Sequence, residues 1–294
     1  MVMKTIRMAV LGVTVLAAGA LAAETQPANP ALGAGKVVTL DEFFNHQEKN
    51  GKQFHYVWED TANSGFSKFG EVWKENGATV QKLHEAPTAE DLKKTSVYIL
   101  VNPSTEKNAA GNQPNYIDEK SIDAIEAWVK DGGVLLMLAN DKNNCEFEHY
   151  NKLAERFGFT FDGNLRNTAP RPADRPHAIF ERERDHFPNH PLFAGLDRIY
   201  MKEITTITVK DPSTALLVVD KDPKESDPKS GGVGEGKDVI MFAAKVGKGT
   251  VLAIGDPWIY NEYIDLNKPP VDNRKGAVNL VQWLLTAAQP VAGK

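Results

Sequence analysis

The sequence of 294 residues contains a single cysteine, Cys145, which has no second cysteine to pair with. An intrachain disulfide and a cysteine-rich metal site are therefore excluded. The 7 histidines form neither an HExxH pattern nor a close pair on one helical face. We expect no metal site and no cofactor. Stability must come from a hydrophobic core, which a chain of this length can build.

An excess of basic residues is also missing. The formal net charge is −5 and the isoelectric point is near 5.9, and no dense run of Lys and Arg occurs. Nucleic acid is therefore a disfavoured partner. Beyond the first residues the chain also lacks an apolar run long enough to cross a bilayer.

The first residues have the pattern of an export signal. Lys4 and Arg7 precede an apolar stretch over residues 8–21, and Ala20-Leu21-Ala22 provides small residues at a cleavage site. The apolar stretch is short for a membrane span. We predict a signal peptide over residues 1–22, a periplasmic or extracellular location, and no membrane attachment after cleavage.

The rest of the chain alternates strand-like and helix-like patterns. Residues 23–36 are rich in Pro, Ala and Gly and predict a flexible lead, and residues 37–290 predict a single domain. The fold class expected is α/β, with a mostly parallel flavodoxin-like sheet flanked by helices. Two adjacent apolar runs separated by Gly247 predict a hairpin, and thus some antiparallel strands in the C-terminal half.

Four apolar runs end in Asn or Asp, at residues 54–60, 96–102, 134–141 and 251–256. If these runs are neighbouring parallel strands, their ends meet at one carboxyl edge, where open α/β sheets bind ligands. We call this set the strand-end row. Its members are Asp60, Asn102, Asn140, Asp141 and Asp256.

Aromatic and amide residues accompany the strand-end row. Trp58, Trp258 and Tyr260 could stack on a sugar ring, and Asn63 could hold a ligand at the start of the next helix. A second interpretation stays open. Asp60 and Asn63 are also residues that helix caps prefer, and Trp258 and Tyr260 could fill the core while Asp256 caps a turn.

No standard catalytic motif occurs in the chain. Cys145 lies beyond the strand end and lacks flanking glycines, so it does not form a nucleophile elbow. A hydrolase could instead pair Asp256 with Glu262 or Asp60 as acid and base. The Asp side chains of the row are also oxygen ligands of the type that Ca²⁺ or Mg²⁺ uses, although no calcium-loop spacing supports such a site.

Several sequence blocks carry a family resemblance, among them AIEAWVKDGGVLLMLAND, VWEDTANSGFSKFG and GDPWIYNEYID. The chain resembles class I glutamine amidotransferase-like domains. It is also similar to the C-terminal extension of bacterial unsaturated rhamnogalacturonyl hydrolases. The nucleophilic cysteine motif is absent, so the resemblance implies no glutaminase. It implies instead a pectin-degradation setting and a sugar or uronic-acid ligand.

These observations lead to one leading hypothesis for function and two alternatives. The chain is expected to be a secreted carbohydrate-handling domain that binds acidic, rhamnogalacturonan-type oligosaccharides and assists a companion glycoside hydrolase. Arg166, Arg171 and Arg175 could pair with a uronate, or could be solvated loop residues. The alternatives are a hydrolase that uses the carboxylates of the row and a non-catalytic structural or interaction module.

Overall fold

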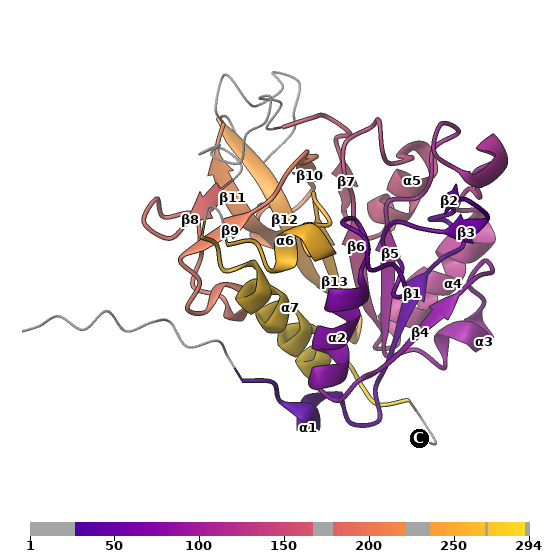
Figure 1. Ribbon diagram of the computed structural model, residues 1–294, viewed down its shortest axis with the longest axis horizontal. Helices are drawn as coiled ribbons and strands as arrows, with labels where there is room; N and C mark the ends of the chain where they lie inside the picture. Colours follow the sequence, from indigo (N-terminus) through magenta and orange to yellow (C-terminus); the bar gives the residue numbers. More distant parts are fainter. Residues whose placement is uncertain (1–26, 167–178, 222–235, 268–269, 292–294) are drawn as a thin grey trace, which may run out of the picture.

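A seven-stranded central sheet organises the chain (Figure 1). The computed structural model describes residues 27–166, 179–221, 236–267 and 270–291. Across the sheet the strand order is β11-β12-β13-β6-β5-β1-β4. In chain order the strands are β1 (Val37–Asp41), β4 (Thr79–Leu83), β5 (Val97–Val101), β6 (Val134–Leu138), β11 (Ala215–Asp220), β12 (Lys237–Val246) and β13 (Gly249–Ile254).

The expected fold class is confirmed. The strands β4, β1, β5, β6 and β13 pair in parallel in that spatial order, which is the flavodoxin-like arrangement. The antiparallel addition is the hairpin of β12 and β13, extended by β11. Gly247 forms the turn of the hairpin with a φ of 59°, a left-handed conformation that glycine adopts easily.

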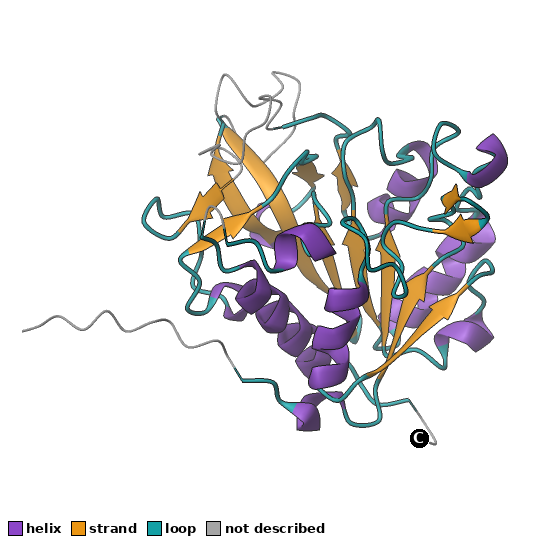
Figure 2. Cartoon of the chain, in the orientation of Figure 1, coloured by secondary structure: helices purple, strands orange, loops and turns teal. Residues whose placement is uncertain are grey.

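Helices cover both faces of the sheet (Figure 2). On one face lie α2 (Ser67–Glu75), α6 (Asn261–Ile264) and α7 (Asn273–Ala287), and on the other lie α3 (Ala89–Leu92), α4 (Glu119–Lys130) and α5 (Glu148–Arg156). Side chains alternate between the two cores along each strand, as Leu136 and Met137 do in β6. Because helices cover both faces of the sheet, the parallel strands have apolar side chains on both faces.

Smaller elements complete the chain. Three two-stranded sheets and three short 3-10 helices lie in the connections among the described residues. The sheets pair β2 (Glu48–Lys49) with β3 (Lys52–Gln53), β7 (Phe159–Phe161) with β10 (Ile207–Val209), and β8 (Ile179–Glu181) with β9 (Arg198–Tyr200). The 3-10 helices are η1 (Ala110–Asn112), η3 (Pro191–Phe193) and η4 (Pro212–Thr214).

The prediction of a strand over residues 54–60 was wrong. This segment has no strand pairing, and the first strand of the sheet is β1, which lies between β4 and β5. His55 and Tyr56 have φ values of 61° and 52°, which are incompatible with extended backbone. Asp60 therefore does not follow a strand.

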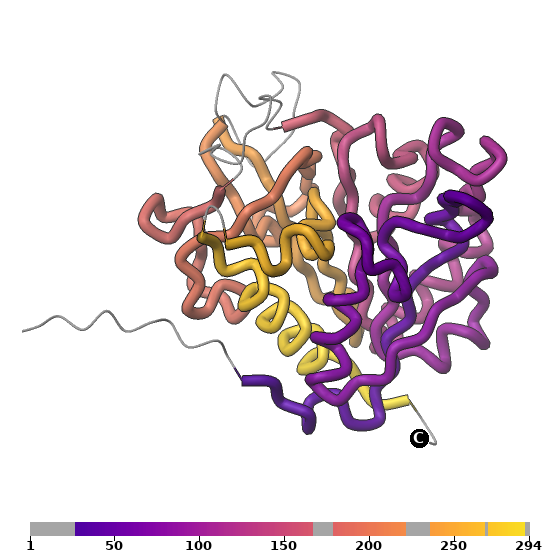
Figure 3. The backbone as a smooth tube through the Cα atoms, in the orientation of Figure 1, coloured from indigo at the N-terminus to yellow at the C-terminus, as the bar shows by residue number. Residues whose placement is uncertain are grey.

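Part of the predicted flexible lead is structured. Residues Pro30–Gly33 form a short helix, α1, that contacts α2 and α7. The backbone N–H of Gly33 donates to the carbonyl of Asn76 at 2.9 Å. In the tube view (Figure 3) α2 lies beside α7, and α1 also contacts α7, so helices from the N-terminal and C-terminal parts of the described chain meet on one face of the sheet.

Candidate functional site

The ends of β5, β6 and β13 bring most of the strand-end row together. The backbone N–H of Asn140 donates to Oδ1 of Asn102 at 2.6 Å, and the N–H of Asp141 donates to Oδ1 of Asn140 at 2.8 Å. Asn102 has a φ of 40°, because the chain must turn sharply where β5 ends. The row is thus a chain of hydrogen bonds between neighbouring strand ends.

Tyr56 links this chain to the end of β13. Its hydroxyl accepts a hydrogen bond from Nδ2 of Asn102 at 3.0 Å, and its ring lies 5.7 Å from that of Tyr260. Tyr260 donates to Oδ1 of Asp256 at 2.8 Å, and the backbone N–H of Lys202 donates to Oδ2 at the same distance. Tyr56 and Tyr260 therefore occupy the space between the strand ends.

The carboxyl group of Asp256 is fully buried. Burial raises the pKa of Asp256 to about 8, although the hydrogen bonds from Lys202 and Tyr260 partly offset this effect. The group is consequently largely protonated near neutral pH. It cannot serve as the ionised nucleophile or base of a hydrolase in this closed arrangement.

Asp141 and Cys145 have local structural roles. The carboxylate of Asp141 accepts hydrogen bonds from the N–H of Asn143 and from the side chain of Asn144, both at 2.8 Å. Cys145 is buried, and burial raises the pKa of its thiol well above the usual range. This buried environment is unfavourable for a nucleophilic thiolate, as the missing motif around Cys145 also indicates.

Asp60 and Asn63 do not join the row. The Asp60 carboxylate accepts hydrogen bonds from the N–H groups of His55 at 3.1 Å and Ala62 at 2.8 Å, which shape its own loop. Asn63 is exposed, and its carbonyl accepts from the N–H of Glu262. The predicted pairing of Asp60 with Asp256 as acid and base has no support in this geometry.

The predicted stacking residues lie in the core. Trp58 and Trp258 are 9% and 3% exposed. Nε1 of Trp58 donates to the carbonyl of Gln81 at 3.0 Å, and Trp258 packs closely against Gly276. Together with Tyr260, these rings fill the space between the sheet and its helices. The core interpretation of the aromatic residues is the one that the structure favours.

The arginine predictions have mixed outcomes. Nε of Arg166 donates to Asp238 at 3.0 Å, and both side chains are buried. Arg166 is therefore a structural residue and not a partner for a uronate. Arg171 and Arg175 lie outside the described residues, as does the proposed signal peptide over residues 1–22, so those expectations stay predictions.

The sequence reasoning missed two carboxylates at the end of β1. Asp41 accepts hydrogen bonds from the N–H of Phe44 and from the hydroxyl of Tyr98, and burial raises the pKa of Asp41 to about 7. Burial also raises the pKa of Glu42 to about 7, and its carboxylate lies 3.6 Å from Nζ of Lys82. The run Val37–Leu40 ends in Asp-Glu, the same signal that identified the other strand ends.

The crevice between β1 and β5 is the position where a flavodoxin-like sheet reverses its strand order and binds ligands. Here the chain itself covers this position. The N–H of Ser104 donates to the carbonyl of Phe44, and the N–H of His46 donates to Oγ of Ser104, both at 2.8 Å. The loops after β1 and β5 are thus joined directly to each other.

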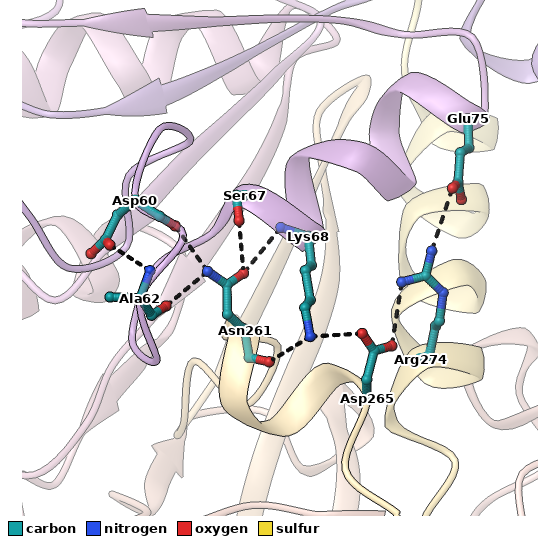
Figure 4. A network of polar contacts seen from close by, with 8 residues as sticks. All are labelled: Asp60, Ala62, Ser67, Lys68, Glu75, Asn261, Asp265 and Arg274. Atoms are coloured by element: carbon teal, nitrogen blue, oxygen red, sulfur yellow. Dashed lines mark hydrogen bonds and ion pairs between the residues drawn. The ribbon is translucent and has the colours of Figure 1, made fainter.

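A loop over residues 54–65, which we call the strap, covers the strand-end row and carries Tyr56. Asn261 of α6 holds it in place (Figure 4). Its Nδ2 donates to the carbonyls of Asp60 and Ala62, both at 2.8 Å, and its Oδ1 accepts from the N–H of Lys68 at 3.0 Å. One amide side chain therefore joins the strap, α2 and α6.

Two open hollows of the described surface lie elsewhere. One of about 620 Å³ is lined by Glu181, Arg198 and Val271 among others, and one of about 380 Å³ lies by Trp128 and Pro290. Neither includes a member of the strand-end row. Within the described ranges, no three His, Cys, Asp or Glu side chains are placed to hold a metal ion. In the same ranges, no helix is both long and apolar enough to cross a bilayer.

The fold and the site define an α/β domain of flavodoxin-like arrangement whose carboxyl edge is closed by its own side chains. The chain belongs to the family described as Domain of unknown function (DUF4350), whose model matches residues 59–267. No curated protein matches the sequence.

Several solved structures are similar to this chain at low sequence identity. The N-terminal domain of mmIFT52 has a TM-score of 0.58 and 15% identity, with 85% of this chain and 98% of that chain covered. The cytoplasmic protein STM1381 from Salmonella typhimurium LT2 has a TM-score of 0.50 and 11% identity, with 86% and 100% covered. A ThuA-like protein from Bacteroides uniformis has a TM-score of 0.46 and 20% identity, with 88% and 95% covered.

These comparisons correct the family resemblance. The matching family is DUF4350, and the similar structures named above are not extensions of unsaturated rhamnogalacturonyl hydrolases. The blocks that carried the resemblance are helices, strand ends and the loop before α2, and a shared fold alone does not carry a shared function. The pectin setting rested on that resemblance and is therefore not retained.

Proposed function

We propose that this chain is a non-catalytic binding module. The observation that carries the proposal is that the strand-end side chains bond to one another and to backbone groups. Asn102, Asp141 and Asp256 are all buried with hydrogen-bond partners. Acid-base catalysis needs two carboxyl groups that reach the substrate, with pKa values suited to opposite roles. The strand-end row does not supply such a pair.

A carbohydrate remains the proposed ligand class. Amide, phenol and carboxyl groups are the hydrogen-bonding groups that sugar hydroxyls need, and the row with its two tyrosines contains all three. The row contains no cationic side chain, so it offers no charged partner to a uronate. Binding of an acidic oligosaccharide and assistance to a companion hydrolase stay predictions. Export from the cytoplasm also stays a prediction.

The test is an assay of turnover paired with calorimetry on the full chain. The chain is incubated with neutral oligosaccharides and with unsaturated acidic ones, and new reducing ends and loss of the unsaturated chromophore are followed. We expect no turnover. Turnover that disappears in Asp256→Asn, while circular dichroism shows that the variant is still folded, would show a catalytic carboxylate and overturn the proposal.

A further inference from the structure

The sequence contains two Asn-Gly pairs, and the structure places them in opposite environments. Asn50-Gly51 forms the turn between β2 and β3, and Asn76-Gly77 follows α2. Asparagine is a thermolabile residue. It loses ammonia most readily before glycine, because glycine has no side chain to hinder attack by its own nitrogen on the asparagine amide. The two pairs share this chemistry, so their surroundings determine which of them reacts.

Asn50 and Gly51 are both exposed, and their φ values of 55° and 72° are both left-handed. Such values belong to the two central residues of a tight hairpin turn, where Asn-Gly is favoured. Within the described part of the chain, neither the side-chain amide of Asn50 nor the N–H of Gly51 has a hydrogen-bond partner. A Cβ placed on Gly51 would meet no atom within 4 Å. No neighbouring group therefore holds the two reacting atoms apart.

Two lysines flank this turn. Lys49 and Lys52 lie directly opposite each other in the pair of β2 and β3, and both are exposed. Attack by the Gly51 nitrogen requires the loss of its proton, and nearby ammonium groups stabilise the negative charge that develops. Like charges directly opposite also weaken a pair of strands, so the tip of the hairpin can adjust as a ring closes. Both effects favour the reaction at this turn.

The second pair, Asn76-Gly77, is protected. Asn76 is fully buried, its Oδ1 accepts from the N–H of Asn29 at 2.9 Å, and its Nδ2 donates to the carbonyl of Val72 at 2.9 Å. The N–H of Gly77 donates to the carbonyl of Lys74 at the same distance. Ring closure here would break these hydrogen bonds inside the folded chain. The second pair is therefore a control within the same molecule.

We propose that Asn50 is a site of spontaneous deamidation, with water as the only co-reactant. The Gly51 nitrogen loses its proton and bonds to Cγ of Asn50, the bond from Cγ to Nδ2 breaks, and the amide group leaves with that proton as ammonia. Water then adds to one of the two carbonyl carbons of the five-membered imide. Opening on one side gives aspartate, and opening on the other gives isoaspartate, in which the main chain runs through the side chain. Nothing is oxidised or reduced.

The modification changes both the charge and the backbone of the hairpin. Each product carries a new carboxylate between Lys49 and Lys52, and isoaspartate also adds a methylene group to the main chain, which alters the geometry of a two-residue turn. We expect the pairing of β2 with β3 to be lost in the isoaspartate form. The base of the hairpin should persist, because Nε2 of Gln53 donates there to the carbonyls of Glu42 at 3.0 Å and Asn45 at 2.9 Å.

The test is peptide mapping by mass spectrometry after incubation of the full chain at neutral pH, folded and in guanidinium chloride. The peptide that contains Asn50 should gain one mass unit and become a substrate for isoaspartyl methyltransferase. In the folded chain we expect Asn50 to react within about tenfold of its rate in denaturant, and Asn76 to react at least about a hundredfold more slowly than in denaturant. Reaction at Asn50 only in denaturant would overturn the proposal. Equal rates at Asn50 and Asn76 in the folded chain would also overturn it.

Variants of exposed residues test the residue and the charges. Asn50→Gln should abolish the mass gain of this peptide, because a glutamine would have to close a larger and slower-forming ring. A mass gain that persists in Asn50→Gln would assign the reaction to another side chain and overturn the site. Replacing Lys49 and Lys52 together by Gln should slow the reaction about two- to fivefold, while Lys152→Gln, at an exposed position outside the hairpin, is the matched control. Equal rates in these two variants would overturn the role of the flanking lysines.

Discussion

Asn102 shows how one side chain can satisfy a sharp turn at a strand end. Its left-handed backbone suits asparagine, while its Oδ1 and Nδ2 satisfy the N–H of Asn140 and the hydroxyl of Tyr56. The sequence indicated this residue, because an apolar run ends there. It could not indicate the bond to Tyr56, since that partner comes from a loop whose conformation depends on the rest of the fold.

Replacing Asn102 should therefore be costly. Asn102→Ala leaves two buried polar groups without their partner, and we expect the free energy of unfolding to fall by about 2–4 kcal/mol. Asn112→Ala is the matched control, because Asn112 has a φ of 56° and is exposed. Urea denaturation measures both variants. Equal losses in the two would show that backbone strain, and not hydrogen bonding, dominates at Asn102.

The buried carboxyl of Asp256 predicts a dependence of stability on pH. Its folded pKa is about 8, above the ordinary value of 3.8, so the folded state holds the proton where the unfolded state has lost it. The contribution of Asp256 to stability is fully present below about pH 4 and falls as pH rises toward about 8. Asp256→Asn removes this dependence.

We therefore expect Asp256→Asn to gain stability relative to the wild type as pH rises through this window. We expect a gain of at least about 1.4 kcal/mol in the free energy of unfolding, which is the energy that corresponds to a difference of one pKa unit between the folded and unfolded states. Thermal or urea unfolding at several pH values measures it. Parallel pH profiles for the two proteins would contradict a raised pKa at Asp256.

At the scale of elements, two helices begin at residues whose side chains cap them. Thr88 caps α3 with a full capping box, and Asp118 caps α4 by accepting from the N–H of Ser121. The run over residues 54–60 misled because aromatic and β-branched residues suit a buried loop as well as a strand. The missed strand β1 is only five residues long and lacks any alternation of polar and apolar side chains at its start.

The link between Arg166 and β12 is the element-scale interaction that we expect to matter most for stability. Arg166 and Asp238 are 4% and 0% exposed, so Arg166→Met removes a buried cation that lies 3.0 Å from a buried carboxylate. We expect a loss of about 3–5 kcal/mol in the free energy of unfolding.

An exposed ion pair supplies the control for this variant. Lys248→Met removes the partner of Asp131, where both side chains are more than three quarters exposed, at 76% and 82%. Chemical denaturation should show little or no change there, because solvent screens an exposed ion pair. If the free energy of unfolding falls by a similar amount in the two variants, the buried Arg166–Asp238 pair does not contribute more to stability than the exposed pair.

At the scale of the whole molecule, one sheet carries both hydrophobic cores. Along each strand, successive side chains point into one core and then the other. The strand β13, from the second half of the chain, pairs with β6 from the first half. The parallel pairing of most strands was predicted from the sequence, because strands that alternate with helices pair in parallel through right-handed crossovers, but the central position of β1 was not predicted. The ligand could not be inferred from the sequence, because a fold that unrelated proteins share does not determine a function.

We expect this arrangement to unfold in a single cooperative step. The five tryptophans report on the packing of the cores and far-ultraviolet circular dichroism reports on the helices and strands. In urea the two signals should have the same midpoint. Separate midpoints would indicate that the N-terminal and C-terminal halves of the sheet come apart independently.

The burial of Cys145 has a practical consequence for the handling of the protein. The thiolate is the form that oxidants attack, and here the thiol is both 2% exposed and held in its protonated form. Two folded copies therefore have no accessible sulfur through which to cross-link. The native protein should keep its monomer mass through prolonged storage in air without a reducing agent, and it should react with thiol reagents only after denaturation.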